Sequence, residues 1–560
     1  MCFSTIYLIL KTRKGAKLAT NLQPVEPVIQ RHDSIQLPNP LRYDRDTENR
    51  NHKNYDSSSK NEVLEPDYTA TGASAGQGND VEKAPTAEGR ARGQDPNLVT
   101  WTGLDDPDNP KNWPARRKWI VTIMASAFTF ITPVSSSMVA PALDAVSREF
   151  GMKTQVEASL TLSIFVLAYA IGPLFFGPLS ESYGRVPVLL RTNIFYIAWN
   201  LGCGFATSEA QLLVFRFLAG LGGSAPLVIG GGVVSDCWAP EQRGKAVGIY
   251  SLAPLMGPIA GPVVGGFIAE YTTWRWVFWS TSAAGAVVQI LGYFFLPETH
   301  HPTLLKHKRD RLKRTTGNKD LYTEHDNGKS VLSTIITSFG RPARMLLTQP
   351  IVQVIALYMA YLFGILYLLL ASFPSVWTDI YHESIGIGGL NYISMGIGFL
   401  IGAQINAQVN DRLYIQFKKT HNNEGRPEFR IPPMFVGSVL IPAGLFWYGW
   451  SIQARTHWIL PNIGVATFSL GSIICTQSMQ AYIIDSYPHF AASGLAAAVV
   501  LRSLAGFGFP LLAPYMYEAL DYGWGTSLLG FVSIAIGIPA PWIFWLYGGA
   551  LRAVSKYAAG

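Results

Sequence analysis

Charged residues inside long apolar segments are the first candidates for chemistry in this chain. Arg216 lies about a third of the way into one such segment, and Arg502 lies midway along another. A charge within a bilayer is costly, so a residue of this kind usually faces a partner or a watery cavity and belongs to a solute or proton pathway. We therefore expect both arginines to face the protein interior. For Arg216 the alternative is a side chain that reaches out to the membrane surface.

A short loop between two apolar segments carries a second set of charges. It spans Gly177–Arg185, where Gly177 and Gly184 permit a tight turn. Glu181 and Arg185 place opposite charges at this helix junction. They can cap helix ends or pair across a gate.

Proton coupling needs a group whose pKa changes as its surroundings open, usually a carboxylate. No carboxylate lies in the middle of the first, fourth, fifth or seventh apolar segment. Asp236 and Asp485 lie at segment ends, where structural capping or pairing is the competing role. The candidates for proton coupling are therefore Glu181, Asp236 and Asp485, acting together with Arg216.

Patterns of enzymatic chemistry are absent from the sequence. There is no Walker A pattern, no cluster of metal ligands and no nucleophile–base arrangement. The four cysteines are scattered without metal-like spacing, so no disulfide framework is indicated. We expect no enzymatic activity, no metal and no cofactor.

One apolar segment contains a stretch rich in proline and glycine, Pro254–Gly266. Two sets of residues recur there every four positions, which places each set on one helical face: Pro254, Pro258 and Pro262, and Gly257, Gly261 and Gly265. A bilayer tolerates such a helix because neighbours satisfy the freed carbonyls. Small residues at this spacing also let another helix approach closely. The stretch predicts a bent, close-packed membrane helix.

Composition indicates a membrane protein. Only 14% of the 560 residues are charged, against about 25% in ordinary globular domains, and 49% are hydrophobic. Twelve apolar segments are long enough to cross a bilayer: 119–141, 157–177, 187–206, 210–235, 244–268, 275–296, 350–373, 386–408, 432–451, 458–483, 492–514 and 525–548. We predict an all-α polytopic membrane protein with twelve transmembrane helices in two six-helix bundles.

The polar parts of the chain set the domain boundaries. Residues 1–115 are too polar to bury a core and are predicted to be disordered, and 298–348 form a basic central loop. The bundles then cover 116–297 and 349–550, followed by a tail at 551–560. Basic residues gather in alternate loops and both tails, which places both termini in the cytoplasm. This topology accounts for the net charge of +7 without nucleic acid.

Several motifs resemble those of the major facilitator superfamily, and more narrowly of fungal twelve-span drug:proton antiporters. Gly177–Arg185 resembles the signature loop after helix two, with Glu181 where aspartate is commoner. Arg216 with Gly220 resembles the helix-four motif, and Gly261–Gly266 the helix-five antiporter motif. Further matches are Asp106–Pro114, Trp274–Trp279, Leu296–Thr299, Pro427–Arg430, Tyr482–Asp485, Ala492–Ala498 and Arg502–Leu504. The resemblance covers about residues 105–550.

The signature loop departs from the family pattern at one position. Val186 stands where the family often has a second basic residue. The corresponding loop of the second half is recognisable only at Asn410–Arg412. We expect the charge network of the gate to lie mainly in the first half.

The resemblance implies alternating access, in which two bundles rock about a central site. In the superfamily, helices one, four, seven and ten line that site, which carries over to Arg216, Ser224, Gln353, Tyr358, Tyr361, Tyr367, Gln477 and Gln480. The alternative for the tyrosines is packing against neighbours or lipid. Gating or proton coupling is expected of Glu181, Arg185, Arg216, Asp236, Asp485 and Arg502. The antiporter motif comprises Gly257, Pro258, Gly261, Pro262, Gly265 and Gly266, with Gly261 and Gly265 expected where the two bundles slide.

The function implied is proton-coupled efflux of small lipophilic compounds, either drugs and toxins or secondary metabolites. A polyamine or nutrient transporter on the same fold is the alternative, and a membrane receptor that does not transport is a third possibility. The expected partners are a small-molecule substrate, protons and the lipid bilayer, with no nucleic acid. We expect a monomer in the cell membrane, with the vacuolar membrane as the other location.

Overall fold

The structure is a computed structural model that describes residues 95, 97–103, 105–324, 331–487, 490–553 and 555. Within these ranges, the structure describes the backbone but not the side chains at 240, 241, 243, 244, 331–339 and 492. The predicted disorder of residues 1–94 lies outside the described residues, as does most of the predicted tail at 551–560.

The first half of the chain contributes six long apolar units. They are α2 (Ala115–Ser137), α4 (Gln155–Tyr183), α5 (Arg185–Gly204), α6 (Glu209–Gly223) continued by α7 (Ala225–Cys237), α8 (Pro240–Tyr271) and α9 (Arg275–Phe295), with a short α3 (Leu143–Phe150) after α2. Two of them begin at residues that cap helices well. The side chains of Thr154 and Ser208 accept hydrogen bonds from first-turn amides of α4 and α6.

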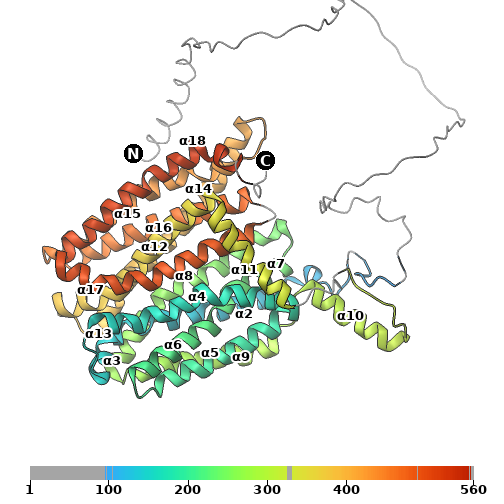
Figure 1. Cartoon of the computed structure of the whole chain (residues 1–560), viewed down its shortest axis with the longest axis horizontal. Coiled ribbons are helices and arrows are strands. Elements are labelled where there is room, and N and C mark those ends of the chain that lie inside the picture. The colour runs from blue at the N-terminus through green and yellow to red at the C-terminus, as the bar shows by residue number, and fades with distance from the viewer. Residues whose placement is uncertain are drawn as a thin grey trace, which may run out of the picture. The chain divides into compact units, whose positions relative to one another are not determined.

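The second half repeats this arrangement. It contains α12 (Pro350–Ser375), α13 (Ile385–Leu390) leading into α14 (Tyr392–Thr420), α15 (Pro432–Gln453), α16 (Ile459–Ser486), α17 (Ala491–Gly537) and α18 (Pro539–Ala553). A π-helical turn, Val376–Ile380, extends α12. In Figure 1, α2 to α9 run from blue to green and α12 to α18 from yellow to red, and the two groups form separate layers.

The predicted twelve-helix fold is confirmed, although ten described stretches are helical, long and apolar enough to count as membrane spans. One of the ten, Ser493–Ala553, has 61 residues, enough for about 90 Å of helix and two crossings. The backbone of Asp521 (φ 53°, ψ 179°) separates these two crossings. The remaining crossing is α5, which is more polar but packs between α6 and α9.

Residues just before α2 differ from the sequence prediction. We predicted disorder to residue 115, but Asp106 is buried, accepts hydrogen bonds from Thr102 and Asp108, and forms a 2.8 Å salt bridge with Lys308. Lys308 belongs to α10 (His301–Thr316), and the backbone near Leu98 pairs with Tyr322. The predicted central loop is therefore partly helical, with α10 and α11 (Val331–Thr348), and it holds the segment that precedes α2.

The glycines of α8 face a different partner from the one predicted. A Cβ on Gly257 would lie 2.5 Å from Pro133, and one on Gly261 would lie 2.7 Å from the carbonyl oxygen of Val134. A Cβ on Gly265 would likewise clash with the carbonyl oxygen of Met138. All three glycines therefore pack on α2 within the first half, and our prediction that Gly261 and Gly265 lie between the halves is wrong.

The adjacent face of α8 makes the contact between halves. A Cβ on Gly266 would lie 2.8 Å from the carbonyl oxygen of Ile385, and one on Gly389 would lie 2.9 Å from that of Pro262. The Glu270 carboxylate accepts hydrogen bonds from the Gly386 amide (2.6 Å) and the Ser384 hydroxyl (2.9 Å). We call this contact the far-side seam, because it lies at the helix ends opposite the 298–348 linker, and α4 and α17 form the second long contact between halves.

Candidate functional site

Arg216 is fully buried at the junction of three helices. Its guanidinium donates to the backbone carbonyls of Thr161 (3.0 Å), Ser135 (2.9 Å) and Ser136 (3.1 Å). The last two belong to the final turn of α2, whose carbonyls lack partners within the helix and carry the negative end of its dipole. Arg216 thus caps α2, and the alternative in which it reaches the membrane surface is excluded.

Aromatic rings and an amide surround this arginine. The guanidinium carbon lies 4.7 Å from the ring centre of Phe165 and 5.6 Å from that of Phe278, within cation–π range. Asn200 is completely buried nearby, accepts a hydrogen bond from the Ser135 hydroxyl and donates to Thr281. Sequence reasoning missed Asn200, although an asparagine in the middle of an apolar segment was a visible signal.

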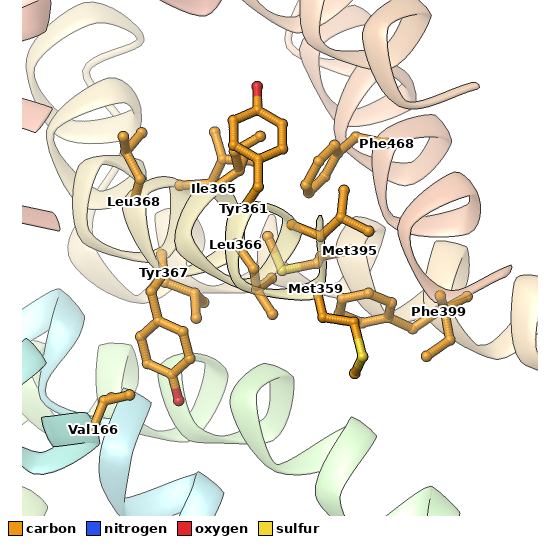
Figure 2. Packing of buried hydrophobic residues seen from close by; sticks show 14 of the residues in the cluster. Val166, Met359, Tyr361, Ile365, Leu366, Tyr367, Leu368, Met395, Phe399 and Phe468 are labelled. Atoms are coloured by element: carbon orange, nitrogen blue, oxygen red, sulfur yellow. The ribbon is translucent and has the colours of Figure 1, made fainter. Parts of the chain in front are cut away.

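Tyr367 connects this centre to the second half. Its hydroxyl lies 2.9 Å from the hydroxyl of Ser136, next to the carbonyl that Arg216 binds. Figure 2 shows Tyr361 and Tyr367 pointing to opposite sides of α12, with Tyr367 directed at helices of the first half near Val166. Of the predicted tyrosines, Tyr367 is therefore the one placed between the halves.

Arg502 of α17 lies on the other side of Tyr367. Its guanidinium carbon is 4.6 Å from the ring centre of Phe363, and that ring is 4.9 Å from the Tyr367 ring. The Nε of Arg502 is buried without a hydrogen-bond partner in the part of the chain that the structure describes, while the residue as a whole is only partly buried.

The other residues predicted to line a cavity are placed within one half. The Tyr358 hydroxyl contacts Cys475 of α16, and the Tyr361 hydroxyl donates to the carbonyl of Leu529. For these two tyrosines the packing alternative describes the structure.

The polar candidates also bond locally. Ser224 donates to the Leu221 carbonyl, Gln477 accepts from Asn406, and Gln353 is exposed and donates to the Leu347 carbonyl. Gln480 is partly buried near the end of α16.

Of the two charged residues predicted to cap helix ends or pair across a gate, Arg185 forms an ion pair, and its partner lies in the same half. Arg185 lies 3.4 Å from Asp236 and donates to the Ser180 hydroxyl at 2.8 Å, whereas Glu181 is exposed. Gly184 (φ 96°) is the single residue between α4 and α5, in a backbone conformation that favours glycine.

Glu298 completes this loop from the end of α9. Its carboxylate accepts hydrogen bonds from the Arg185 (3.1 Å) and Val186 (3.2 Å) amides, so it caps the N-terminus of α5. The sequence reasoning assigned no role to Glu298, although its Leu296–Thr299 motif was noted.

The second half carries a larger charge network than predicted. Arg430 binds Asp485 (2.9 Å) and Asp411 (2.6 Å) and lies 4.3 Å from the ring centre of Tyr414. Arg552 adds a salt bridge to Glu428 at 3.1 Å. Our prediction that the charge network lies mainly in the first half is wrong, because Arg430 reaches back to both α14 and α16, which no local sequence pattern indicates.

A surface pocket of about 190 Å³ lies at the linker end of the first half. The segment before α2 and α10 form it, and it is lined by Pro107, Asp108, Trp113, Arg117, Pro297, Glu298, Leu304, His307, Lys308 and Arg311. None of the residues predicted for the substrate cavity belongs to this pocket. It is therefore separate from the contact at Tyr367.

Comparison with known proteins identifies the family. The family model of the Major Facilitator Superfamily matches residues 125–510. The efflux pump vrtL of Penicillium aethiopicum is 55% identical over 502 residues, covering 89% of this chain and 99% of that protein. The MFS-type transporter penM of Penicillium rubens is 40% identical over 464 residues, covering 83% and 91% respectively.

A solved structure shares the fold. The xylose transporter XylE from E. coli, in a partially occluded inward-open conformation, matches with a TM-score of 0.58 at 16% identity, over 77% of this chain and 98% of that chain. At this identity the match supports the fold alone. Together with the family model and the fungal relatives, it leads to one conclusion: this chain belongs to the Major Facilitator Superfamily and is a membrane transporter, not an enzyme.

Proposed function

We propose that this transporter exports small lipophilic compounds, such as drugs, toxins or secondary metabolites, by proton-coupled alternating access. The observation that carries the direction of transport is the 55% identity to a protein named an efflux pump, over nearly the full length of both chains. Proton coupling and antiport rest on the arrangement of charges described above.

The contacts between halves support alternating access. On the far side, Glu270 and the glycine-to-carbonyl contacts of α8 and α13 hold the halves together. Towards the linker, the Arg185–Asp236 and Arg430–Asp485 pairs each lie within one half. Separation at one end and closure at the other would then expose the Tyr367 region to each side in turn.

Asp236 is the carboxylate we favour for proton coupling. It lies at the end of α7, which continues α6, so one helical unit joins it to Arg216. A carboxylate that loses its arginine partner takes up a proton more readily. Movement of Arg185 away from Asp236 would therefore load a proton, and its return would release the proton.

The remaining parts of the proposal concern location. We place the linker and both termini in the cytoplasm of a monomer in the cell membrane, with the far-side seam facing outward. The proton gradient across that membrane would supply the energy, and the vacuolar membrane is the alternative location.

Export is tested in a yeast strain without its own drug pumps. Cells expressing the chain are loaded with a panel of lipophilic compounds, and loss is followed with the outside acidic or neutral. Faster loss of at least one compound with the outside acidic is expected. Accumulation under the same gradient would instead indicate import, as in a nutrient or polyamine transporter, and would overturn the proposal.

Proton coupling is tested separately with Asp236→Asn. This change keeps a hydrogen-bonding group but removes the titratable one, so flux driven by a pH gradient should fall to the level of empty vesicles. Asp310→Asn on α10, whose carboxylate pairs with neighbouring Arg309 at the surface, is the matched control. Unchanged gradient-driven flux in Asp236→Asn would exclude Asp236 as the proton carrier.

A further inference from the structure

The middle of the described membrane spans carries positive charge without negative charge. Arg216 and Arg502 are the charged side chains that these helices direct inward away from their ends. Acidic residues lie towards helix ends: none occurs between Glu209 and Asp236, or between Asp485 and Glu518. The spans that carry the two arginines therefore offer them no carboxylate at mid-depth.

The groups that act electrostatically on these arginines are neutral at physiological pH. Around Arg216 they are Cys203, Tyr169, Tyr196 and Tyr367. Around Arg502, the one such group among the described residues is Tyr367. Thiols and phenols ionise well above neutrality in apolar surroundings, so they do not compensate a guanidinium.

The two arginines differ in how well their charge is satisfied. Arg216 donates to three backbone carbonyls, two of them at the negative end of α2. Arg502 has the Phe363 ring at 4.6 Å and a buried Nε that no described residue pairs with. A desolvated guanidinium without an anion is costly in a membrane, and that cost is removed when an anion binds.

Tyr367 brings the two charges to one place between the halves. Through Ser136 it lies next to the carbonyls that hold Arg216, and through Phe363 it lies next to Arg502. Both guanidinium groups are close enough to act on the Tyr367 hydroxyl. The Phe363 ring, 4.9 Å from the Tyr367 ring, adds apolar surface beside the two charges.

We propose that the cargo of this transporter is an organic anion with an apolar body, a carboxylic acid or an acidic phenol, whose charge binds Arg502 beside Tyr367. This inference rests on the proposed export function and names its substrate class. Arg216 adds a second positive charge that is fixed in place by α2. An anion at Arg502 would supply the missing partner, whereas a cation would be repelled by both guanidinium groups.

The direct test is binding to the full chain in nanodiscs. Equilibrium dialysis compares three probes with the same ring system: 2-naphthoate, its neutral methyl ester, and the cationic 2-naphthylmethyl-trimethylammonium. The acid should bind at least about tenfold more tightly than the ester, and the cation most weakly. Equal binding of acid and ester, stronger binding of the cation, or no binding of the acid up to about 1 mM would overturn the inference.

Variants of Arg502 test whether this residue binds the carboxylate of the probe. Arg502→Gln should reduce 2-naphthoate binding about tenfold or more and leave the ester unchanged, while Arg502→Lys should restore most of the preference for the acid. Arg191→Gln, which removes an exposed arginine from α5, is the matched control. Thermal unfolding of each variant checks folding, which should survive because the Arg502 Nε bonds to none of the described residues. Wild-type preference for the acid in Arg502→Gln would overturn the assignment.

The two proposals fail in different ways. Export of neutral or cationic compounds alone, without anions, would keep the proposed function and overturn the anion inference. Selective binding of 2-naphthoate by a protein that imports compounds in yeast would support the anion inference and overturn export.

Discussion

Gly266 offers a test of whether the far-side seam opens during transport. It meets backbone atoms of the opposite half: an added Cβ would lie 2.8 Å from the Ile385 carbonyl oxygen and 3.4 Å from the Cα atoms of Gly386 and Gly389. Backbone atoms cannot move away by a rotamer change as a flexible side chain can. Gly266→Ala therefore forces the two halves apart at this point. The clash exists only while the seam is closed.

The expected magnitude follows from overpacking. Forcing a methyl group into a packed contact costs about 1–3 kcal/mol. At about 1.4 kcal/mol per factor of ten, the ratio of open to closed seam should rise roughly 5-fold to 150-fold. Alanine also gains about 1 kcal/mol of helix propensity over glycine in either state, which leaves that ratio unchanged.

Spin labels at Tyr271 and Ile387 report on the seam, because both side chains are exposed beside it. With the native cysteines replaced, double electron–electron resonance should show a new, longer distance in Gly266→Ala. Gly248→Ala is the control on the same helix, since a Cβ there meets no atom of the described residues within 4 Å. Gly261→Ala should instead lower thermal stability without a longer distance, because its clash is with α2 of the same half. A distance distribution in Gly266→Ala identical to wild type would refute the reasoning.

Two further predictions concern charges near the linker. Burial opposes ionisation of Asp106, but hydrogen bonds from Lys308 and Thr102 outweigh it and hold the pKa of that carboxyl well below its usual range. Its stabilising effect should be complete above the unfolded pKa of about 3.9 and lost as the pH falls below it. The protection factors of the amides in 97–103 and 105–113, that is, their intrinsic exchange rates divided by the observed rates, should therefore fall between about pH 5 and pH 3 in the wild type, whereas in Asp106→Asn they should be low throughout; identical profiles would contradict this. Arg430→Gln leaves Asp485 without its partner and should cost about 1.5–3 kcal/mol, measured by thermal unfolding. The exposed Arg426–Glu424 pair is the control, where Arg426→Gln should change stability by less than about 1 kcal/mol, and equal effects would count against a structural role for Arg430.

Hydropathy predicted the fold because the bilayer demands long apolar helices whatever their partners. It could not predict which face of a helix meets which neighbour. On α12, Tyr361 and Tyr367 point in opposite directions, yet both faces of the helix are apolar, since one packs in its own half and the other meets the opposite half. Gly261 and Gly266 show the same limit: the small-residue spacing predicted a close approach but not its partner.

The structure of the polar regions was not predicted, for a different reason. The segment around Asp106 has the composition of a disordered chain, and its order depends on Lys308, which lies far along the sequence. Likewise Arg430 joins Asp411 and Asp485 from two separate helices. A local sequence pattern does not indicate polar pairs between residues that are far apart in the chain. The charges that sequence reasoning could find, Arg216 and Arg502, were those made conspicuous by apolar surroundings.

The single-residue break at Asp521 has a mechanical consequence. A residue with φ of 53° and ψ of 179° joins the last two crossings without a loop, in a conformation that residues other than glycine rarely adopt. The last two crossings are therefore joined without a flexible linker. When α17 moves against α4, both crossings must move together as one rigid body. Inserting a few glycines at Asp521 would let the two crossings move independently.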